Sequence, residues 1–298
     1  MSPRLVLLIA VLATTYAGPV IRFAAAPALA IAFWRLAFAL PVTGALWRRD
    51  GSGNEDRSRR TLWLMLLSGT LLALHFWTWI TSLRYTSVAS SVLIVNLRPI
   101  IVWLLAAVWL GEHPEASERW GITLAVIGAI LIGVGDARFS WGALTGDLLA
   151  LLGATAAAGY SVIGRRVRRT VGIWRYATVV YGVAAMVLVL VAVLTGTRLW
   201  GFAARDWTIF AALAAGPMLV GHTGINYALK HLRATTVNVA GLGEPVGATL
   251  IAWLVPSIHE IPRPATLAGG ALVLGGIALA LATGGAREPR AVTLPADA

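Results

Sequence analysis

The chain contains no cysteine and few charged residues. Without cysteine it can form no disulfide framework, no thiolate nucleophile and no cysteine-based metal site. Only 12% of its 298 residues are charged and 58% are apolar, whereas a typical soluble domain has about 25% charged and under about 50% apolar residues. The mean hydropathy is +0.78. This composition excludes a soluble globular protein and indicates an integral membrane protein.

Sequence signatures of enzymes are also scarce. No G-x-x-x-x-G-K-[ST] string is present, so the sequence predicts no ATP hydrolysis, and no His, Asp and Glu residues have the spacing of a zinc protease. The acidic group Glu112, Glu115 and Glu118 with His113 is the one cluster that a membrane-embedded enzyme could use, and it is more typical of a solvated loop. We therefore expect no enzymatic activity, no cofactor and no metal.

Apolar runs in the sequence are long enough for ten transmembrane helices. A helix needs about 20 apolar residues to cross the hydrocarbon core of a bilayer, and charged residues, Gly/Pro clusters and tryptophans bound such runs in this chain. The expected spans are 5–23, 28–47, 62–83, 87–110, 118–135, 146–164, 173–195, 207–229, 235–255 and 265–284. The first run could instead be a cleavable signal peptide, but its length and the spans that follow favour a transmembrane helix.

The basic residues predict the orientation of these spans. The net charge is +11, and all but one of the 24 basic residues are arginine. If the N-terminus is cytoplasmic, sixteen basic residues fall on the cytoplasmic side and six on the opposite side. Because cytoplasmic loops carry an excess of Lys and Arg, both termini are expected in the cytoplasm. The positive charge therefore predicts membrane topology, and no nucleic acid partner is expected.

The two halves of the chain are similar to each other. Offsets of 146 and 148 residues align Leu83 with Leu229, Pro99 with Pro245, Glu112 with Glu260, Gly121 with Gly269 and Gly128 with Gly276. Each half then holds five expected spans, and because five is odd, the second copy enters the membrane upside down. We expect a five-helix repeat at 1–137, an inverted repeat at 138–286 and a disordered cytoplasmic tail at 287–298.

Motifs in both halves resemble those of a known family. The first-half motifs are His75-Phe76, Trp79, Ser82 to Ser91, Pro99 and Gly111-Glu112. The second-half motifs are Gly146 to Leu151, Tyr160, Arg165-Arg166, Tyr227 to Lys230, Glu244-Pro245-Val246 and Glu260. Together they resemble the drug/metabolite transporter superfamily, EamA branch, over nearly the whole chain. Pro256 to His259 depart from the family pattern, in which Leu-Gly usually precedes the residue at Glu260.

The resemblance implies an all-α integral membrane protein with ten transmembrane helices in two inverted five-helix repeats, in a bacterial inner membrane. It also implies a secondary transporter that exports small metabolites, amino acids or amphiphilic compounds by alternating access, driven by proton exchange or by the solute gradient. The alternatives are an uncoupled facilitator and an accessory or flippase-like subunit. The expected partners are a small-molecule substrate and membrane lipids. Small residues in the fifth and tenth expected spans permit close packing, either within a monomer or in a homodimer.

Two charged residues fall well inside expected spans and are equivalent in the two repeats. Arg98 lies about eleven residues into the fourth span, and the 146-residue offset aligns it with Glu244 in the ninth. Because a charge at the bilayer centre is costly, it indicates a functional site. Arg98 could bind a carboxylate or phosphate of the substrate, and Glu244 an amine or a coupling proton; alternatively, the two charges neutralise each other. Pro99 and Pro245, which follow them, are expected to kink their helices.

Two pairs of polar residues have helical spacing. His75 and Trp79 share a face of the third expected span, and His222 and Asn226 share a face of the eighth. Such pairs can line a wet cavity, and His75 could exchange a proton near neutral pH. The alternative is that they form hydrogen bonds between helices, which stabilise membrane bundles.

Further candidates depend on the cavity that the resemblance implies. In the family the first and sixth helices complete that cavity, and Tyr16 and Tyr160 are the residues here that could contact substrate, with core packing as the alternative. Ser91 lies on almost the same helix face as Arg98 and is a candidate hydrogen-bonding residue. Arg35 is expected to extend toward a membrane interface.

Overall fold

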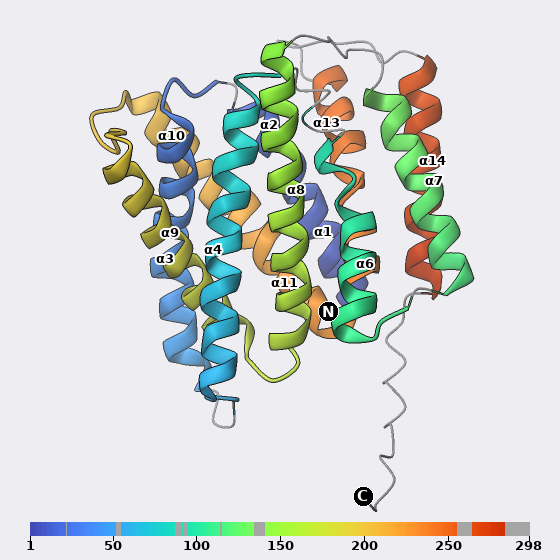
Figure 1. The fold of residues 1–298 in the computed structure, drawn as a ribbon, viewed down its shortest axis with the longest axis horizontal. Coiled ribbons are helices and arrows are strands. Elements are labelled where there is room, and N and C mark those ends of the chain that lie inside the picture. Colours follow the sequence, from blue (N-terminus) through green and yellow to red (C-terminus); the bar gives the residue numbers. More distant parts are fainter. Residues whose placement is uncertain are drawn as a thin grey trace, which may run out of the picture.

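The structure is a computed structural model that describes residues 1–21, 23–51, 55–86, 91, 94–113, 115–133, 141–254 and 264–283. Its regular secondary structure within these residues is helical, so the predicted all-α class is confirmed (Figure 1). The helices are α1 (Pro3–Thr15), α2 (Ala17–Ile21), α3 (Ala28–Asp50), α4 (Arg59–Ser82), α6 (Arg98–Leu110), α7 (Ala116–Gly133), α8 (Trp141–Val167), α9 (Ile173–Leu194), α10 (Ala204–Leu213), η2 (Ala214–His222), α11 (Thr223–His231), α12 (Ala234–Ala240), α13 (Gly243–Leu254) and α14 (Pro264–Thr283).

Seven described helical segments are long and apolar enough to cross a membrane, as in a multi-pass membrane protein. They are Pro3–Ile21, Ala28–Asp50, Arg59–Ser82, Ala143–Val167, Ile173–Leu194, Ala204–His231 and Pro264–Ala282. The other expected spans, 87–110, 118–135 and 235–255, contain α6, α7 and the pair α12–α13. Among the described residues, the helices of these three regions are therefore not both long enough and apolar enough to count as spans. Residues 87–90, 92 and 93 of the fourth expected span are outside the described residues.

The ninth expected span is interrupted in its middle. α12 ends at Ala240, and α13 begins at Gly243. In the turn between them, the Leu242 amide donates to the Val239 carbonyl and the Glu244 amide donates to the Gly241 carbonyl, both at 3.0 Å. These short-range bonds replace the i to i−4 bonds of a continuous helix. The expected span 235–255 is therefore divided between two helices.

A similar turn precedes α6. The Leu97 amide donates to the Ile94 carbonyl at 3.1 Å, and the Ile100 amide donates to the Leu97 carbonyl at 3.0 Å. Pro99 and Pro245 consequently lie in the first turns of α6 and α13 and do not bend the middle of a continuous helix as expected. A proline in a first turn removes an amide hydrogen that has no acceptor within the helix, so it is compatible with these starts.

The segment from α10 to α11 is continuous, but its middle third is π-helical. η2 contains Pro217, which lacks an amide hydrogen, and such residues are a known cause of local changes in helical bonding. A Cβ added to Gly216 would collide with the Tyr16 ring, and one added to Gly221 would lie 2.6 Å from the Thr14 methyl group. The close approach of α1 to η2 therefore depends on these two glycines.

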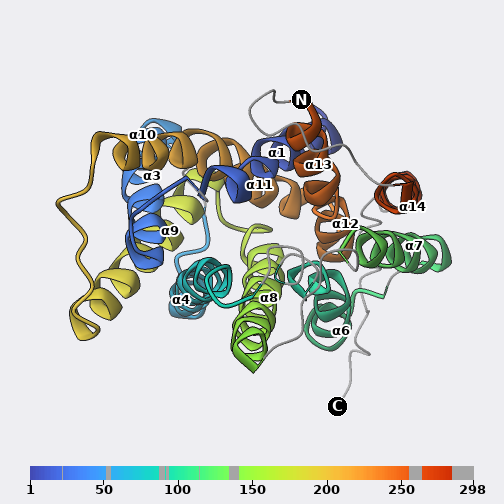
Figure 2. The ribbon, with the colours of Figure 1, turned by 90° about the horizontal axis from the view of Figure 1, so that it is seen from above.

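Helices of the first half, α1 to α7, pack chiefly on helices of the second half, α8 to α14. α7 packs on α14, α6 on α12 and α3 on α9. α4 packs on α8, and correspondingly η2 and α11 pack on α1. Seen from above, α7 and α14 form one end of the molecule, and α3, α9 and α10 form the other (Figure 2).

Glycines allow α7 and α14 to cross closely at two points. A Cβ added to Gly121 would lie 2.7 Å from the Gly276 carbonyl oxygen, and one added to Gly276 would lie 2.5 Å from the Gly121 carbonyl oxygen. At the second crossing, Gly128 lies against the Gly269 carbonyl. The small residues of the fifth and tenth expected spans thus pack against each other within the chain.

Candidate functional site

A polar cavity lies where helices of both halves meet. Its volume is about 60 Å³, which is room for a few water molecules. Its walls come from α1, α2, α3, α4, the turn before α6, α6, η2, α11 and α13. The lining residues are Thr14, Ala17, Arg35, His75, Phe76, Trp79, Val95, Asn96, Arg98, Pro217, His222, Ile225, Glu244 and Pro245. We refer to this site as the central cavity.

Arg35 is a buried cation in the central cavity, so the expectation that it would extend to a membrane interface is wrong. It is 1% exposed, and its guanidinium carbon lies 4.2 Å from the centroid of the Phe76 ring. Its Nε and Nη1 atoms have no hydrogen-bond partner among the described residues. Because an unpartnered buried charge is costly, this geometry leaves Arg35 available to bind an anion.

Arg98 and Glu244 line the same cavity. The Thr14 hydroxyl donates to Glu244 Oε1 at 2.9 Å, while Arg98 Nε has no partner among the described residues. Arg98 also reaches the break between α12 and α13, because a Cβ added to Gly241 would lie 2.7 Å from Arg98 Nη2. The ion pairs of the described residues do not include one between Arg98 and Glu244. Arg98 and Glu244 therefore line one cavity without a direct ion pair between them.

His75 and Trp79 form one wall of the central cavity. His75 Nδ1 lies 2.9 Å from the Gly153 carbonyl oxygen of α8. Because a carbonyl only accepts, Nδ1 carries the proton, and Nε2 of the neutral ring is left as an acceptor. The two rings are stacked with centroids 6.0 Å apart, and Trp79 Nε1 has no partner among the described residues.

His222 lines the cavity, whereas Asn226 and Tyr160 lie behind it. The His222 ring meets Phe76 edge to face at 5.0 Å, and its centroid is 6.4 Å from that of Tyr160. Asn226 Nδ2 donates to the Tyr160 hydroxyl at 2.5 Å. His222 Nδ1 and Asn226 Oδ1 lack partners in the described part of the chain. Tyr160 and Asn226 are thus placed to support His222, outside the cavity lining.

Two other predicted site residues also lie outside the lining. The Tyr16 hydroxyl donates to the Ala212 carbonyl at 3.1 Å, which joins the end of α1 to α10. The Ser91 hydroxyl lies 2.7 Å from that of Ser82. Both side chains are therefore occupied by contacts within the protein.

The cavity also contains residues that the sequence did not single out as binding residues. Arg35 had a usable signal, because it lies inside the expected span 28–47 just as Arg98 lies inside 87–110. Asn96 lines the cavity because the turn before α6 redirects it. Pro99 is the sequence signal nearest to that turn. Phe76 carried no signal beyond its place next to His75.

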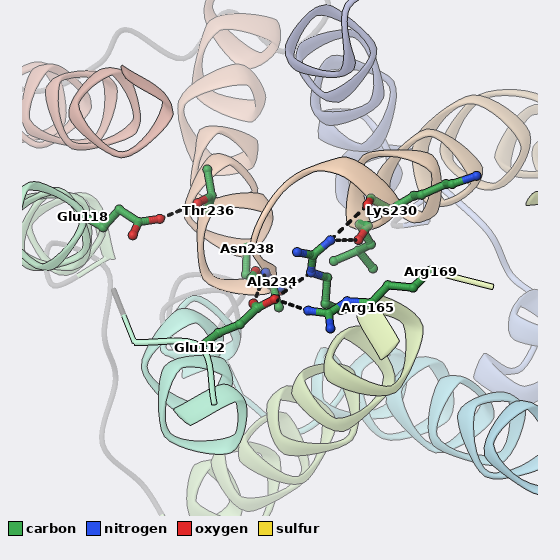
Figure 3. Close-up of polar contacts among 9 residues, drawn as sticks. Glu112, Glu118, Arg165, Arg169, Lys230, Ala234, Thr236 and Asn238 are labelled. Atoms are coloured by element: carbon green, nitrogen blue, oxygen red, sulfur yellow. Dashed lines mark hydrogen bonds and ion pairs between the residues drawn. The ribbon is translucent and has the colours of Figure 1, made fainter. Parts of the chain in front are cut away.

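A second group of charges, which we call the acidic-loop cluster, lies at the C-terminal ends of α6 and α8. It consists of Glu112, Glu115, Glu118, Arg165, Arg169 and Arg233. Arg165 Nε and Arg169 Nη2 donate to Glu112 Oε1 at 2.8 and 2.9 Å, and the Ala234 amide donates to Glu112 Oε2 at 3.3 Å (Figure 3). Arg165 Nη1 also donates to the Leu229 and Lys230 carbonyls, which satisfies acceptors at the end of α11.

Glu118 is the most buried acid of this cluster, at 1% exposed. It forms an ion pair with Arg233, accepts a bond from the Thr236 hydroxyl at 2.6 Å (Figure 3) and accepts another from the Glu115 amide at 3.0 Å. The expectation of a solvated acidic loop is therefore wrong for Glu112 and Glu118, whereas His113 and Glu115 are exposed. Basic residues that are distant in the sequence surround the loop, and composition alone does not show this.

Comparisons with known proteins agree on one family. The family model described as the EamA-like transporter family matches residues 1–134 and 144–282. The Pseudopaline exporter CntI of Pseudomonas aeruginosa is 27% identical over 248 residues, which cover 83% of this chain and 84% of that protein. The Probable terminal-alkyne amino-acid exporter of Streptantibioticus cattleyicolor is 27% identical over 63% of this chain and 62% of that protein.

A solved structure has the same fold. It is a crystal structure that is 22% identical and superposes with a TM-score of 0.79. The match covers 95% of this chain and 98% of that chain.

Proposed function

The chain belongs to the EamA-like transporter family, and we propose that it is a secondary transporter that exports a small polar solute through the central cavity. The observation that carries this proposal is the set of buried polar groups without partners around the cavity: Arg35 Nε and Nη1, Arg98 Nε, Trp79 Nε1 and His222 Nδ1. Buried polar groups in a folded protein are nearly always hydrogen-bonded. Their concentration at one cavity supports a site that a solute completes.

The proposed architecture is ten transmembrane helices in two inverted repeats, 1–137 and 138–286, with both termini cytoplasmic in a bacterial inner membrane. Exchange of the two halves maps the pairs α3–α9 and α7–α14 onto themselves and maps α4–α8 onto the packing of α11 and η2 on α1. It also maps the contact of Gly121 with Gly276 onto that of Gly269 with Gly128. This reciprocal packing supports the internal twofold relation of an inverted repeat.

Alternating access would open the cavity to one side at a time. The acidic-loop cluster joins the loop after α6 to α8 and to the start of α12, so it links the two halves at the end we propose to be cytoplasmic. Opening that side requires these ion pairs to break. An amino-acid-sized solute also requires the cavity to widen beyond about 60 Å³, which is consistent with a structure closed toward the cytoplasm.

Glu244 and His75 are the proposed proton-coupling residues. A proton and a solute ammonium group would compete for Glu244, which the Thr14 hydroxyl orients. His75 presents its unprotonated Nε2 because Gly153 accepts from Nδ1. The names of the relatives, an amino-acid exporter and a pseudopaline exporter, support a metabolite as cargo. Arg98, Trp79 and His222 are the proposed substrate-binding residues, with Tyr160, Asn226, Tyr16 and Ser91 in supporting positions.

Transport can be measured with the purified protein in proteoliposomes loaded with labelled amino acids and small organic acids. We expect efflux of at least one solute in the wild-type protein and in Arg205→Ala, because Arg205 is exposed and does not line the cavity, and loss of that efflux in Arg98→Ala. Efflux in Arg98→Ala equal to that of the wild-type protein would contradict the proposed path. If efflux is indifferent to a pH gradient and unchanged in Glu244→Gln, the protein is an uncoupled facilitator.

A further inference from the structure

The charges of the central cavity define the class of solute, if the proposed function holds. We infer that the ligand is a small organic acid with one ammonium group and two carboxylates, of net charge −1, and that Arg35 is the residue that binds its second carboxylate. Two guanidinium groups, Arg35 and Arg98, line the cavity, whereas Glu244 is its one carboxylate among the described lining residues. A ligand of net charge −1 makes the filled cavity neutral, which is the state that burial favours.

Arg35 is held in place for this role without being neutralised. Its guanidinium lies over the Phe76 ring at 4.2 Å, so an aromatic face fixes its plane while Nε and Nη1 remain unpartnered. A guanidinium presents N–H groups in a fork that matches the two oxygens of a carboxylate. The ring therefore holds a guanidinium that forms no ion pair with a carboxylate of the described residues.

The three charged groups come from three different helices. Arg35 is on α3, Arg98 begins α6 and Glu244 lies in the first turn of α13. A ligand that contacts all three must present separate anionic and cationic groups. The Glu244 carboxylate, oriented by Thr14, binds the ammonium group, and each arginine binds one carboxylate.

The neutral groups around the arginines also favour an acceptor-rich ligand. Trp79 Nε1 is a donor and can only bind an acceptor. Asn96 and His222 can adapt to either role. A ligand with two carboxylates supplies more acceptors than a neutral amino acid and so satisfies more of these unpartnered groups.

The test compares five-carbon compounds that differ by one charged group. Thermal unfolding of the purified protein is followed with L-glutamate, L-glutamine, glutarate or sodium chloride added at matched ionic strength. We expect glutamate to raise the unfolding temperature most, because glutamine lacks the second carboxylate and glutarate lacks the ammonium group. In Arg35→Met the glutamate response should fall to that of glutamine, with affinity for glutamate at least about tenfold weaker, while the glutamine response remains.

Arg205→Met is the matched control, because the Arg205 guanidinium also lies over an aromatic ring, that of Phe23, at 5.7 Å, but on an exposed side chain outside the cavity lining. It should keep the preference for glutamate over glutamine. A panel in which glutamate shifts the wild-type protein no more than glutamine or chloride does overturns the ligand class. If labelled solutes are still exported in that case, the proposed transport function stands and the inferred charge pattern alone is wrong.

Discussion

The central cavity and the acidic-loop cluster both contain buried charge, and they differ in how their charges are partnered. In the acidic-loop cluster, the carboxylates of Glu112 and Glu118 each accept three hydrogen bonds from the protein. In the central cavity, Arg35 and Arg98 keep N–H groups that have no partner among the described residues. The buried charges of the acidic-loop cluster are thus paired within the protein, whereas the arginines of the central cavity keep unpartnered donors.

The difference follows from the free energy of burying a charge. Removing a charge from water costs several kcal/mol unless a partner of opposite charge and further hydrogen bonds replace the water. The acidic-loop cluster meets this requirement within the protein, so its free energy is independent of a ligand. The arginines of the central cavity lack such partners among the described residues. Functional sites in natural proteins often reduce the stability of the folded state in this way. The comparison predicts opposite effects of substitution at the two places.

The largest effect is expected at Glu118. Glu118→Ala removes the buried acceptor of the Thr236 hydroxyl and the Glu115 amide and leaves Arg233 only its longer contact with the exposed Glu115, which should lower the free energy of unfolding by about 3 kcal/mol or more. Denaturant or thermal unfolding in detergent measures this. Glu115→Ala is the control, because that carboxylate is 43% exposed and 3.3 Å from Arg233, and its loss should change stability by under about 1 kcal/mol. Equal effects of the two substitutions would contradict the proposed importance of pairing.

Double-mutant cycles should give couplings of opposite sign in the two groups. For Glu112→Gln with Arg165→Gln, the pair at 2.8 Å should show a favourable coupling of about 0.5–3 kcal/mol. Arg35 and Arg98 are both cations that line one cavity. For Arg35→Gln with Arg98→Gln, each single substitution should therefore remove the repulsion between the two guanidinium groups, and the coupling should be unfavourable. Unfolding free energies of the four variants in each cycle measure both couplings. A coupling near zero between the two arginines would mean that the protein already neutralises them.

Arg35→Met should stabilise the protein while removing function. The thioether side chain fills much of the same volume beside Phe76 and leaves no buried charge, so the free energy of unfolding should rise by about 1 kcal/mol. Solute efflux should be lost, whereas Arg205→Met should alter neither quantity appreciably. Destabilisation by Arg35→Met of the size expected for Glu118→Ala would show that Arg35 has a structural role.

Much of the fold follows from apolar runs, because every expected span contains at least one helix among the described residues. The breaks follow less directly, although Gly241, Gly243 and Pro245 are local signals for the break between α12 and α13. The turn there depends on Gly241 and Gly243, on the missing amide of Pro245 and on the Arg98 side chain that lies against Gly241. That last contact comes from the other half of the chain.

The candidate site was only partly accessible from sequence for a related reason. Helical spacing placed His75 with Trp79, and the repeat placed Arg98 with Glu244, and the structure brings all four to one cavity. Spacing along one helix does not say which helix lies opposite. The sequence therefore predicts that Arg35 extends to a membrane interface, whereas in the structure α3 directs it toward Phe76 of α4.

The smallest effect on stability is expected at Arg169, which can be compared with Arg165 in the same acidic-loop cluster. Arg169 and Arg165 donate to the same Glu112 oxygen at nearly equal distances, but the Arg169 side chain is 37% exposed and that of Arg165 is 6% exposed. Arg169→Ala should change the free energy of unfolding by under about 1 kcal/mol, because water replaces the lost contact. Arg165→Ala should cost clearly more, because it also leaves the Leu229 and Lys230 carbonyls without their donor. Equal losses from the two substitutions would mean that charge on Glu112, and not burial of its partner, determines stability at this end of the molecule.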